Sequence, residues 1–133
     1  LDYLRAKLEF SQQLARIGMW EWETLEDTLH WSDSFNQILD LPTQKRSGSL
    51  HELLQMAHPF ERKKVLALFE DFRSGRNLRP FSFTIITPQQ QIRTIYIKGT
   101  VLESSGSVPV RIGGIVQDVT EAKELENELK YYE

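Results

Sequence analysis

The spacing of apolar residues changes along the chain, and each spacing predicts a different kind of secondary structure. In residues 1–15, Leu1, Leu4 and Leu8 recur at every third or fourth position, which predicts a helix with a narrow apolar stripe. Residues 18–31 instead alternate between apolar and polar side chains on either side of a polar turn. Alternation with a period of two is typical of strands, so this segment is expected to form a β-hairpin.

The next part of the chain returns to helical spacing and predicts three short helices. The first follows Ser32 or Asp33, either of which is a good N-cap, and stops at Pro42. A polar loop is expected over residues 43–48. The apolar positions of the three helices are, in order, Phe35, Ile38 and Leu39; Leu50, Leu53, Leu54 and Ala57; and Val65, Leu68, Phe69 and Phe72.

Local signals mark the ends of the second and third helices. Ser49 and Glu52 have the spacing of a capping box, in which two side chains satisfy two backbone N–H groups at a helix start. His58-Pro59 ends the second helix and begins the third, because proline suits the first position of a helix. Gly75 is the expected residue just past the end of the third helix.

From residue 78 the period is two again, and short turns separate three long strands that should form an antiparallel meander. The residues expected on one face of these strands are Phe81, Phe83 and Ile85; Arg93, Ile95 and Ile97; and Val110, Ile112, Gly114, Val116 and Asp118. Residues 120–132 form a last helix. Its apolar positions are spaced as in a coiled coil, at Ala122, Leu125, Leu129 and Tyr132.

The order of these elements predicts an α+β domain. It contains a five-stranded antiparallel sheet, a helical insert between strands two and three, and a helix at each end. We divide the chain into an N-terminal flanking helix (1–16), a core (17–120) and a C-terminal linker helix (121–133).

Composition and charge exclude several classes of protein. The chain has 133 residues, a net charge of −3 and no cysteine, so disulfides, thiolate metal sites and a cysteine nucleophile are excluded. A weakly acidic chain has no basic surface for nucleic acid, and the short apolar runs predict no membrane insertion by this segment. Because the chain begins at Leu1 and ends within a charged helical pattern, we expect it to be part of a longer protein.

Signatures of catalysis are absent from the sequence. It has no glycine-rich phosphate loop, nucleophile elbow or paired His-Glu motif. His30, His51 and His58 lack the spacing of metal ligands. We therefore expect that this segment is not an enzyme and holds no metal.

Four stretches, in order, resemble the PAS family, in particular the members that carry a PAC motif. They are Ile17-Gly18-Met19-Trp20-Glu21-Trp22, His30-Trp31-Ser32-Asp33, His58-Pro59 followed by Glu61-Arg62, and Gly114-Ile115-Val116-Gln117-Asp118-Val119-Thr120. Two positions depart from the family pattern. Phe60-Glu61 stands where an Asp is usual, and Pro88-Gln89-Gln90 replaces the usual Asp-Gly turn.

The resemblance implies a sensory or signal-relay domain of a multidomain bacterial signalling protein. It implies that the Asp118-Val119-Thr120 motif passes the signal to an output domain in the same chain, a diguanylate cyclase or a histidine kinase. Residues 125–132 resemble the linker that often precedes a cyclase. The alternative is a ligandless dimerisation or interaction scaffold. We expect a cytoplasmic homodimer joined through the flanking helices, whether or not the full-length protein has a membrane anchor.

The aromatic and branched residues of the predicted strands allow two interpretations. They line a pocket for a small-molecule ligand, or they simply pack the core. The candidates are Trp20, Trp22, Trp31, Phe81, Phe83, Ile95, Ile97 and Val116. Haem-binding relatives use a histidine of the long helix, but His58 lies directly before Pro59, where a capping role is expected. Flavin-binding photosensors of this superfamily use a reactive cysteine, which this chain lacks, so covalently bound flavin is not expected. Noncovalent flavin stays open, and the identity of any ligand is unknown.

Asp118 and Thr120 are candidates for signal transmission because both lie where the last strand meets the last helix. Thr120 is a good N-cap, and Asp118 with Glu121 has the spacing of a capping-box-like pair. In the family that the sequence resembles, such a cap also joins the sensor sheet to the output helix. The capping and signalling interpretations are therefore compatible.

Overall fold

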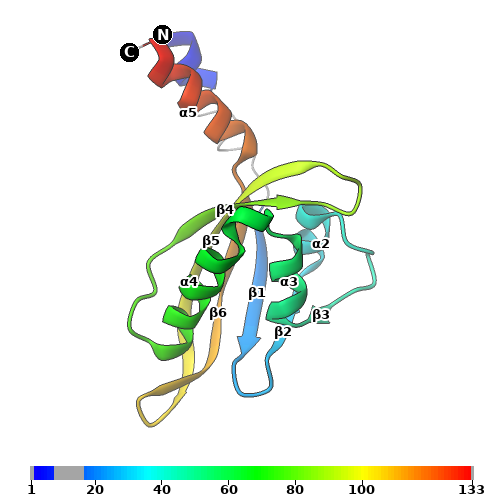
Figure 1. Ribbon diagram of the computed structural model, residues 1–133, viewed down its shortest axis with the longest axis vertical. Helices are drawn as coiled ribbons and strands as arrows, with labels where there is room; N and C mark the ends of the chain where they lie inside the picture. Colours follow the sequence, from blue (N-terminus) through cyan, green and yellow to red (C-terminus); the bar gives the residue numbers. More distant parts are fainter. Residues whose placement is uncertain (1, 8–16, 133) are drawn as a thin grey trace.

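Six antiparallel strands form one curled sheet in the computed structural model, which describes residues 2–7 and 17–132 (Figure 1). Their order across the sheet is β3-β2-β1-β6-β5-β4. The strands are β1 (Ile17–Glu23), β2 (Thr28–Trp31), β3 (Ser47–Gly48), β4 (Phe81–Ile86), β5 (Ile92–Ser105) and β6 (Val108–Asp118). The predicted α+β class, the antiparallel sheet and the helical insert are confirmed.

The sixth strand, β3, lies within the segment predicted as a polar loop. Ser47 pairs with His30 and Gly48 pairs with Leu29, so β3 adds an edge to the β1–β2 hairpin. A pairing of two residues uses only backbone groups and is too short to show an alternating pattern in the sequence. This explains why five strands, not six, are predicted.

Several helices cover one face of the sheet, and the last helix leaves it (Figure 1). The elements on the sheet are α2 (Asp33–Leu39), α3 (Leu50–Met56), the short 3₁₀ helix η1 (Pro59–Glu61) and α4 (Arg62–Ser74). Helix α5 (Thr120–Tyr132) follows β6 directly and projects away from the sheet. Residues 2–7 are also helical, whereas residues 8–16 of the predicted N-terminal helix lie outside the described part.

The core lies between α4 and the face of the sheet predicted from the alternating pattern. Phe83, Ile85, Ile95 and Val116 are all buried on that face. From α4, Val65, Phe69 and Phe72 are buried against them, and Leu68 is half-buried. Burying one such side chain stabilises the fold by roughly 1.5–3 kcal/mol relative to leaving it exposed.

Some helix ends follow the sequence signals and others do not. Gly75 ends α4 with a φ of 72°, as predicted, and Ser49 accepts a hydrogen bond from the N–H of Glu52. Helix α2 ends at Leu39, before Pro42, and its C-cap Asp40 adopts a left-handed conformation. Ser32 is its N-cap, but the Ser32 hydroxyl accepts from the N–H of Met19 in β1 and not from its own helix.

Helix α5 has a buried side although it extends beyond the sheet. Ala122, Leu125 and Leu129 are buried, and Tyr132 is exposed. These are the apolar positions predicted to contact a partner helix, and most of them are already buried within one chain. Among the described residues, no helix is both long enough and apolar enough to cross a membrane.

Candidate functional site

The junction between β6 and α5 is bonded to the neighbouring strand β5. The backbone N–H of Val119 donates to the carbonyl oxygen of Thr94 at 2.9 Å. The carbonyl oxygen of Val119 accepts from the N–H of Lys123 at 2.8 Å, which makes Val119 the last residue before the helix. The helix therefore begins directly at the sheet, with no intervening loop.

Asp118 and Thr120 are bonded to each other on either side of Val119. Oδ1 of Asp118 accepts from the N–H of Thr120 at 3.0 Å and from the Thr120 hydroxyl at 2.6 Å. Oγ1 of Thr120 accepts from the backbone N–H of Thr94 at 2.8 Å. Since the hydroxyl gives its one hydrogen to Asp118, its lone pairs remain available to Thr94. A continuous chain of hydrogen bonds therefore links β5, the start of α5 and the end of β6.

These contacts correct the capping roles expected from the sequence. Thr120 is the first residue of α5, not its N-cap, and its hydroxyl bonds to β5 and to Asp118. Asp118 bonds to Thr120 instead of forming a capping box with Glu121. The physical reason is that Thr94, from a strand distant in sequence, supplies an N–H group that needs an acceptor.

Most of the candidate pocket residues lie in a packed aromatic core. Trp20 stacks on Phe72 with ring centroids 6.5 Å apart, and Trp22 meets the ring of Phe69 edge-on at 5.9 Å. The Phe81 ring contacts Phe69, Phe72 and Phe83. Ile95, Ile97 and Val116 are buried in the same cluster. The space between α4 and the sheet is thus occupied by side chains.

Trp31 packs against the edge of that core, at the wall of a pocket of about 210 Å³ between β2, α2 and α3. Its ring stacks on Phe35 with centroids 4.9 Å apart. The pocket is lined mainly by apolar side chains, with three polar residues among them: Leu29, Trp31, Phe35, Leu39, Leu41, Lys45, Ser49, Glu52, Leu53, Met56 and Pro88. Of the residues proposed from the sequence to line a pocket, Trp31 is the one found here.

Arg93 binds the C-terminal end of α2 from the start of β5. Its Nη1 donates to the carbonyl oxygens of Ile38 and, at 3.3 Å, of Gln37. Its Nη2 lies 3.0 Å from Oδ2 of Asp40 and 2.6 Å from Oε1 of Gln91. A cation suits this place, because the last carbonyl groups of a helix have no partners in the helix and carry partial negative charge.

The alternating pattern of β5 carries a signal for the role of Arg93. The residue lies on the same strand face as Ile95 and Ile97, which are fully buried. A guanidinium group on a core face needs partners, so it indicates a specific polar contact. The partners themselves lie some 55 positions away in the chain and are not visible in the local pattern.

The histidine residues make separate contacts. Nδ1 of His58 accepts from the N–H of Phe60 at 3.2 Å, as a cap of η1. Nε2 of His30 lies 3.2 Å from Oε2 of Glu23. Within residues 2–7 and 17–132, no group of three or more His, Cys, Asp or Glu side chains is placed to hold a metal ion.

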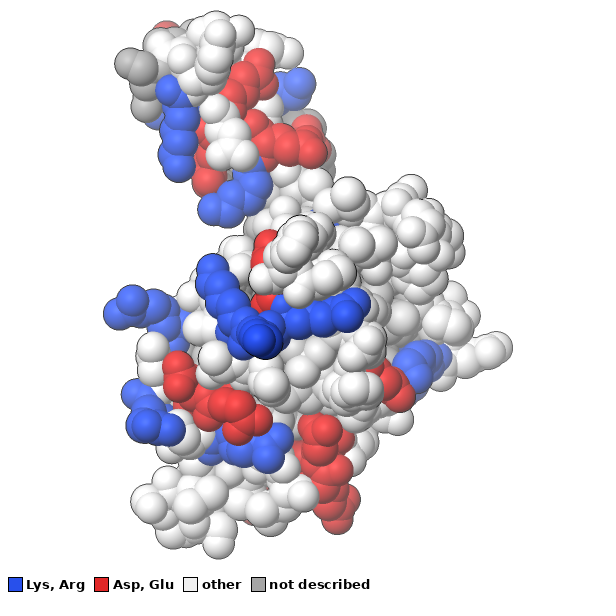
Figure 2. Space-filling model, viewed as in Figure 1, with Lys and Arg blue, Asp and Glu red and all other residues white. Residues whose placement is uncertain are grey.

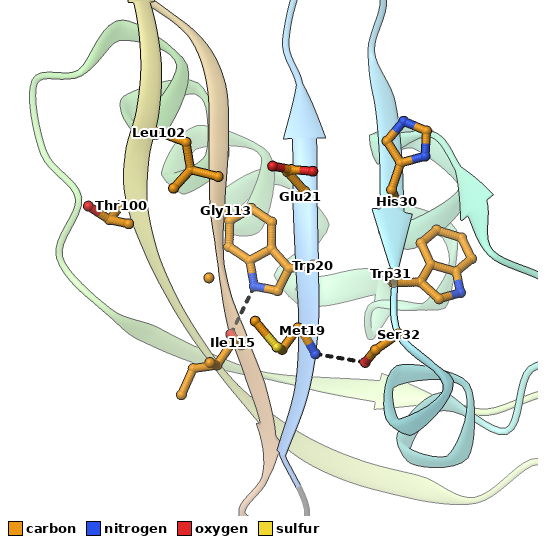
Figure 3. A pocket seen from close by; sticks show the side chains of 11 residues that line it. Met19, Trp20, Glu21, His30, Trp31, Ser32, Thr100, Leu102, Gly113 and Ile115 are labelled. Carbon is orange, nitrogen blue, oxygen red and sulfur yellow. Dashed lines mark hydrogen bonds between the residues drawn. The ribbon is translucent and has the colours of Figure 1, made fainter.

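The opposite face of the sheet has an apolar hollow of about 500 Å³ over β1, β5 and β6 (Figure 3). Met19 and Leu102, at its walls, have 64% and 53% of their surface exposed. Gly113 and Gly114 form part of its floor, where the backbone of β6 lies bare. This face therefore exposes apolar surface that the helices do not cover.

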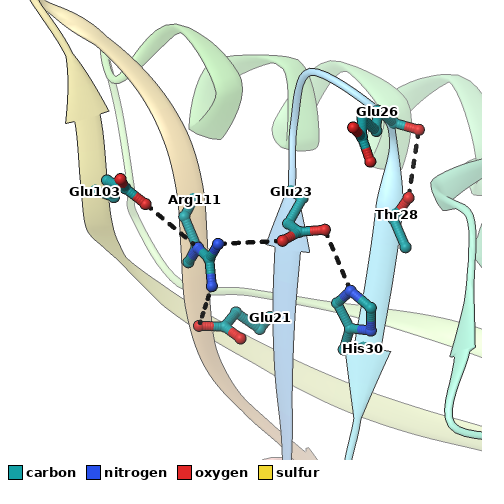
Figure 4. A network of polar contacts seen from close by, with 7 residues as sticks. All are labelled: Glu21, Glu23, Glu26, Thr28, His30, Glu103 and Arg111. Atoms are coloured by element: carbon teal, nitrogen blue, oxygen red, sulfur yellow. Dashed lines mark hydrogen bonds and ion pairs between the residues drawn. The ribbon is translucent and has the colours of Figure 1, made fainter.

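One end of that face is charged (Figure 4). Arg111 of β6 lies among three carboxylates, 3.1 Å from Glu23, 3.5 Å from Glu103 and 3.9 Å from Glu21. His30 bonds to the other oxygen of Glu23. On the helical side, Lys and Arg gather in groups beside groups of Asp and Glu, and neither sign covers the face shown in Figure 2.

Comparison with known proteins identifies the family. The model of the PAS fold matches residues 28–116, which is more than half of the chain. The chain therefore belongs to the PAS fold family. No curated protein matched the sequence.

Solved structures agree with this fold. A sensory box histidine kinase/response regulator from Burkholderia thailandensis E264 has 23% identity and a TM-score of 0.74, over 95% of this chain and 94% of that one. The N-terminal domain of a diguanylate cyclase with PAS/PAC sensor from Marinobacter aquaeolei has 10% identity and a TM-score of 0.71, over 80% and 97%. A domain of a putative light and redox sensing histidine kinase from Haloarcula marismortui has 18% identity and a TM-score of 0.62, over 86% and 99%.

Proposed function

We propose that this PAS domain senses or relays a signal and passes it from the sheet to α5 through Asp118, Val119 and Thr120. The observation that carries this proposal is the hydrogen-bond chain from Thr94 through Thr120 to Asp118. It connects the first residue of α5 to two different strands. A change in the relative position of β5 and β6 would therefore tilt or rotate α5, a rigid element that a following domain is able to read.

The output domain is, in this proposal, a diguanylate cyclase or a histidine kinase in the same chain. Of the solved structures with a similar fold, one comes from a histidine kinase and another from a diguanylate cyclase. The linker-like sequence of residues 125–132 favours the cyclase. The domain acts as a cytoplasmic homodimer through its flanking helices, so that a movement of α5 changes the arrangement of two output domains.

The test is the double substitution Asp118→Ala with Thr120→Ala in the full-length protein. We expect the PAS core to remain folded while output activity no longer responds to the stimulus, or changes at basal level if no stimulus is known. The matched control is Glu121→Ala with Lys123→Ala, two substitutions in the same turn of α5 that leave the bonds to Thr94 intact. If the first pair leaves activity unchanged in a folded protein, the two residues are ordinary structural contacts and the proposal fails.

The second candidate function is a scaffold that binds no ligand and only sets the geometry of an assembly. The apolar hollow on the outer face of the sheet favours it, since large exposed apolar patches commonly mark interaction surfaces (Figure 3). Native mass spectrometry of the purified domain distinguishes the two functions. A small molecule that co-purifies stoichiometrically supports a sensor, and an assembly whose mass equals that of the protein alone supports a scaffold.

A further inference from the structure

The pocket between β2, α2 and α3 has a fixed aromatic wall. Nε1 of Trp31 donates to Oδ1 of Asn36 at 2.8 Å and to the carbonyl oxygen of Lys45 at 3.0 Å. Nδ2 of Asn36 donates to the same carbonyl oxygen. The Trp31 ring is therefore held by a buried amide and by the backbone of the loop, and it stacks on Phe35. This wall is formed before any ligand is present, which lowers the cost of binding.

The size and lining of the pocket define the chemistry of its ligand. An engineered cavity of roughly 150 Å³ binds benzene, so a volume of about 210 Å³ suits one substituted ring or two small fused rings. Lys45 and Glu52 both line the pocket, and Nζ of Lys45 lies 3.4 Å from Oε2 of Glu52. Because these charges are paired, the pocket offers no net charge to a ligand.

We propose that this pocket binds a small neutral aromatic molecule of one or two fused rings, packed against Trp31 and Phe35. The proposal rests on the proposed sensory function and supplies the class of ligand that function lacks. Its site is distinct from the space between α4 and the sheet, where Trp20, Trp22 and Phe69 already fill the interior.

A route from this pocket to α5 runs through Arg93. Phe35 and Leu39 of α2 line the pocket, so a ligand that enters it presses on α2. Arg93 holds the C-terminal end of α2 by its hydrogen bonds to backbone carbonyl oxygens and by its ion pair with Asp40. The next residue, Thr94, bonds to both Val119 and Thr120. A displacement of α2 thus reaches the start of α5 through two adjacent residues of β5.

The binding test uses the isolated chain, with indole, quinoline and phenol as probes, followed by ¹H–¹⁵N NMR. Saturable shifts of the Trp31 indole N–H and of the amides of Leu53 and Met56 are expected. Indole-3-carboxylate is similar in size to these probes but carries a negative charge, so it should bind at least about tenfold more weakly than indole. Its carboxylate would be desolvated in the pocket without an unpaired cation to bind. If none of the three neutral probes shifts these resonances saturably, the proposal is wrong.

Filling the pocket provides the matched comparison. Met56→Trp places a ring in the pocket, and Met19→Trp places the same ring on the opposite face of the sheet. Met56→Trp should weaken probe binding at least about tenfold, while Met19→Trp should leave it within about twofold. If Met56→Trp does not fold, Leu41→Phe replaces it as the pocket-filling variant, because Leu41 lines a different wall of the same pocket. If a folded pocket variant binds the probes as tightly as Met19→Trp does, the probes bind at another site and the proposal is wrong.

The route is tested separately with Arg93→Gln. Saturating probe should shift the amides of Thr94 and Thr120 in the original chain, and Arg93→Gln should abolish those two shifts while the shift at Trp31 persists. Persistence of all shifts would overturn the route through Arg93. The ligand proposal and the transmission proposal fail separately. If no probe binds but the Asp118→Ala, Thr120→Ala protein loses its output, the proposed ligand is wrong and the proposed transmission through Asp118 and Thr120 still stands.

Discussion

The hydroxyl oxygen of Thr120 lies 2.8 Å from the backbone nitrogen of Thr94, so the first residue of α5 is bonded to strand β5. The two residues are 26 positions apart in the chain. Such a contact resists separation of the helix from β5, because breaking it leaves a partly buried N–H group without an acceptor. The stability of this junction can therefore be measured by replacing one side chain.

Replacing Thr120 by valine should destabilise the domain. Valine keeps the shape of threonine but removes the acceptor for Thr94 and the donor to Asp118, so the expected loss is about 1–3 kcal/mol in the free energy of unfolding. Thr120→Ser keeps the hydroxyl group and is the matched control. The measurement is chemical denaturation followed by circular dichroism. A loss of less than about 0.5 kcal/mol for Thr120→Val would show that the bond contributes little.

Phe83→Ala tests the assignment of strand faces. Phe83 is 3% exposed and contacts the Phe81 ring, so its truncation should leave a cavity and cost about 3–5 kcal/mol in the free energy of unfolding. Ile92→Ala, at a position of β5 that is 66% exposed, should cost much less. Denaturation of both variants under the same conditions gives the comparison. Similar losses for the two would contradict the observed core.

Periodicity predicts the long strands well where one face of the sheet is buried, in β4, in the first half of β5 and in β6. The alternation at Phe83, Ile85, Ile95 and Ile97 is therefore visible in the sequence and matches the observed core. Gly75 is also predicted correctly, because a left-handed residue after a helix favours glycine. Each of these features depends on neighbours within a few residues.

Features that depend on distant parts of the chain are missed. The bond between Thr120 and Thr94, and the contact of Arg93 with α2, join segments that approach each other only in the folded sheet. The pocket beside Trp31 is formed where α2 and α3 leave space between them, and helix spacing does not report such a gap. The sequence indicates which residues are available for a site, but not which of them meet.

Dimerisation through the N-terminal helix remains a prediction. A helix of about 15 residues is not stable alone in water, so its apolar stripe must be covered. Deletion of residues 1–15 should leave a folded monomer in sedimentation velocity. Leu4→Glu should weaken the dimer, and Tyr3→Glu is the matched control because Tyr3 is 73% exposed and outside the stripe. A truncated protein that still sediments as a dimer would place the interface elsewhere, with the hollow around Met19 and Leu102 as the next candidate.

Gly114 and Gly113 are adjacent in β6 but should respond differently to alanine. Gly114 lies opposite Gly99 of β5, and a Cβ atom at Gly114 would overlap the carbonyl oxygen of Lys98. A backbone atom in a paired strand cannot move aside without disturbing the sheet. Gly114→Ala should therefore cost at least about 2–3 kcal/mol in the free energy of unfolding, as overpacking of a dense site does.

At Gly113 the nearest atom to an added Cβ is Cδ1 of Leu102, the far end of a side chain that is 53% exposed. That side chain has room to rotate away over the hollow, so Gly113→Ala should cost less than about 1 kcal/mol. Gly106→Ala adds a third case, because its φ of 63° is strained for alanine although no atom lies within 4 Å of the new Cβ. Thermal and chemical denaturation of the three variants should rank Gly114→Ala as the most destabilising. If Gly113→Ala is as damaging as Gly114→Ala, then Leu102 is fixed in place, and the hollow on the outer face is more rigid than its exposure indicates.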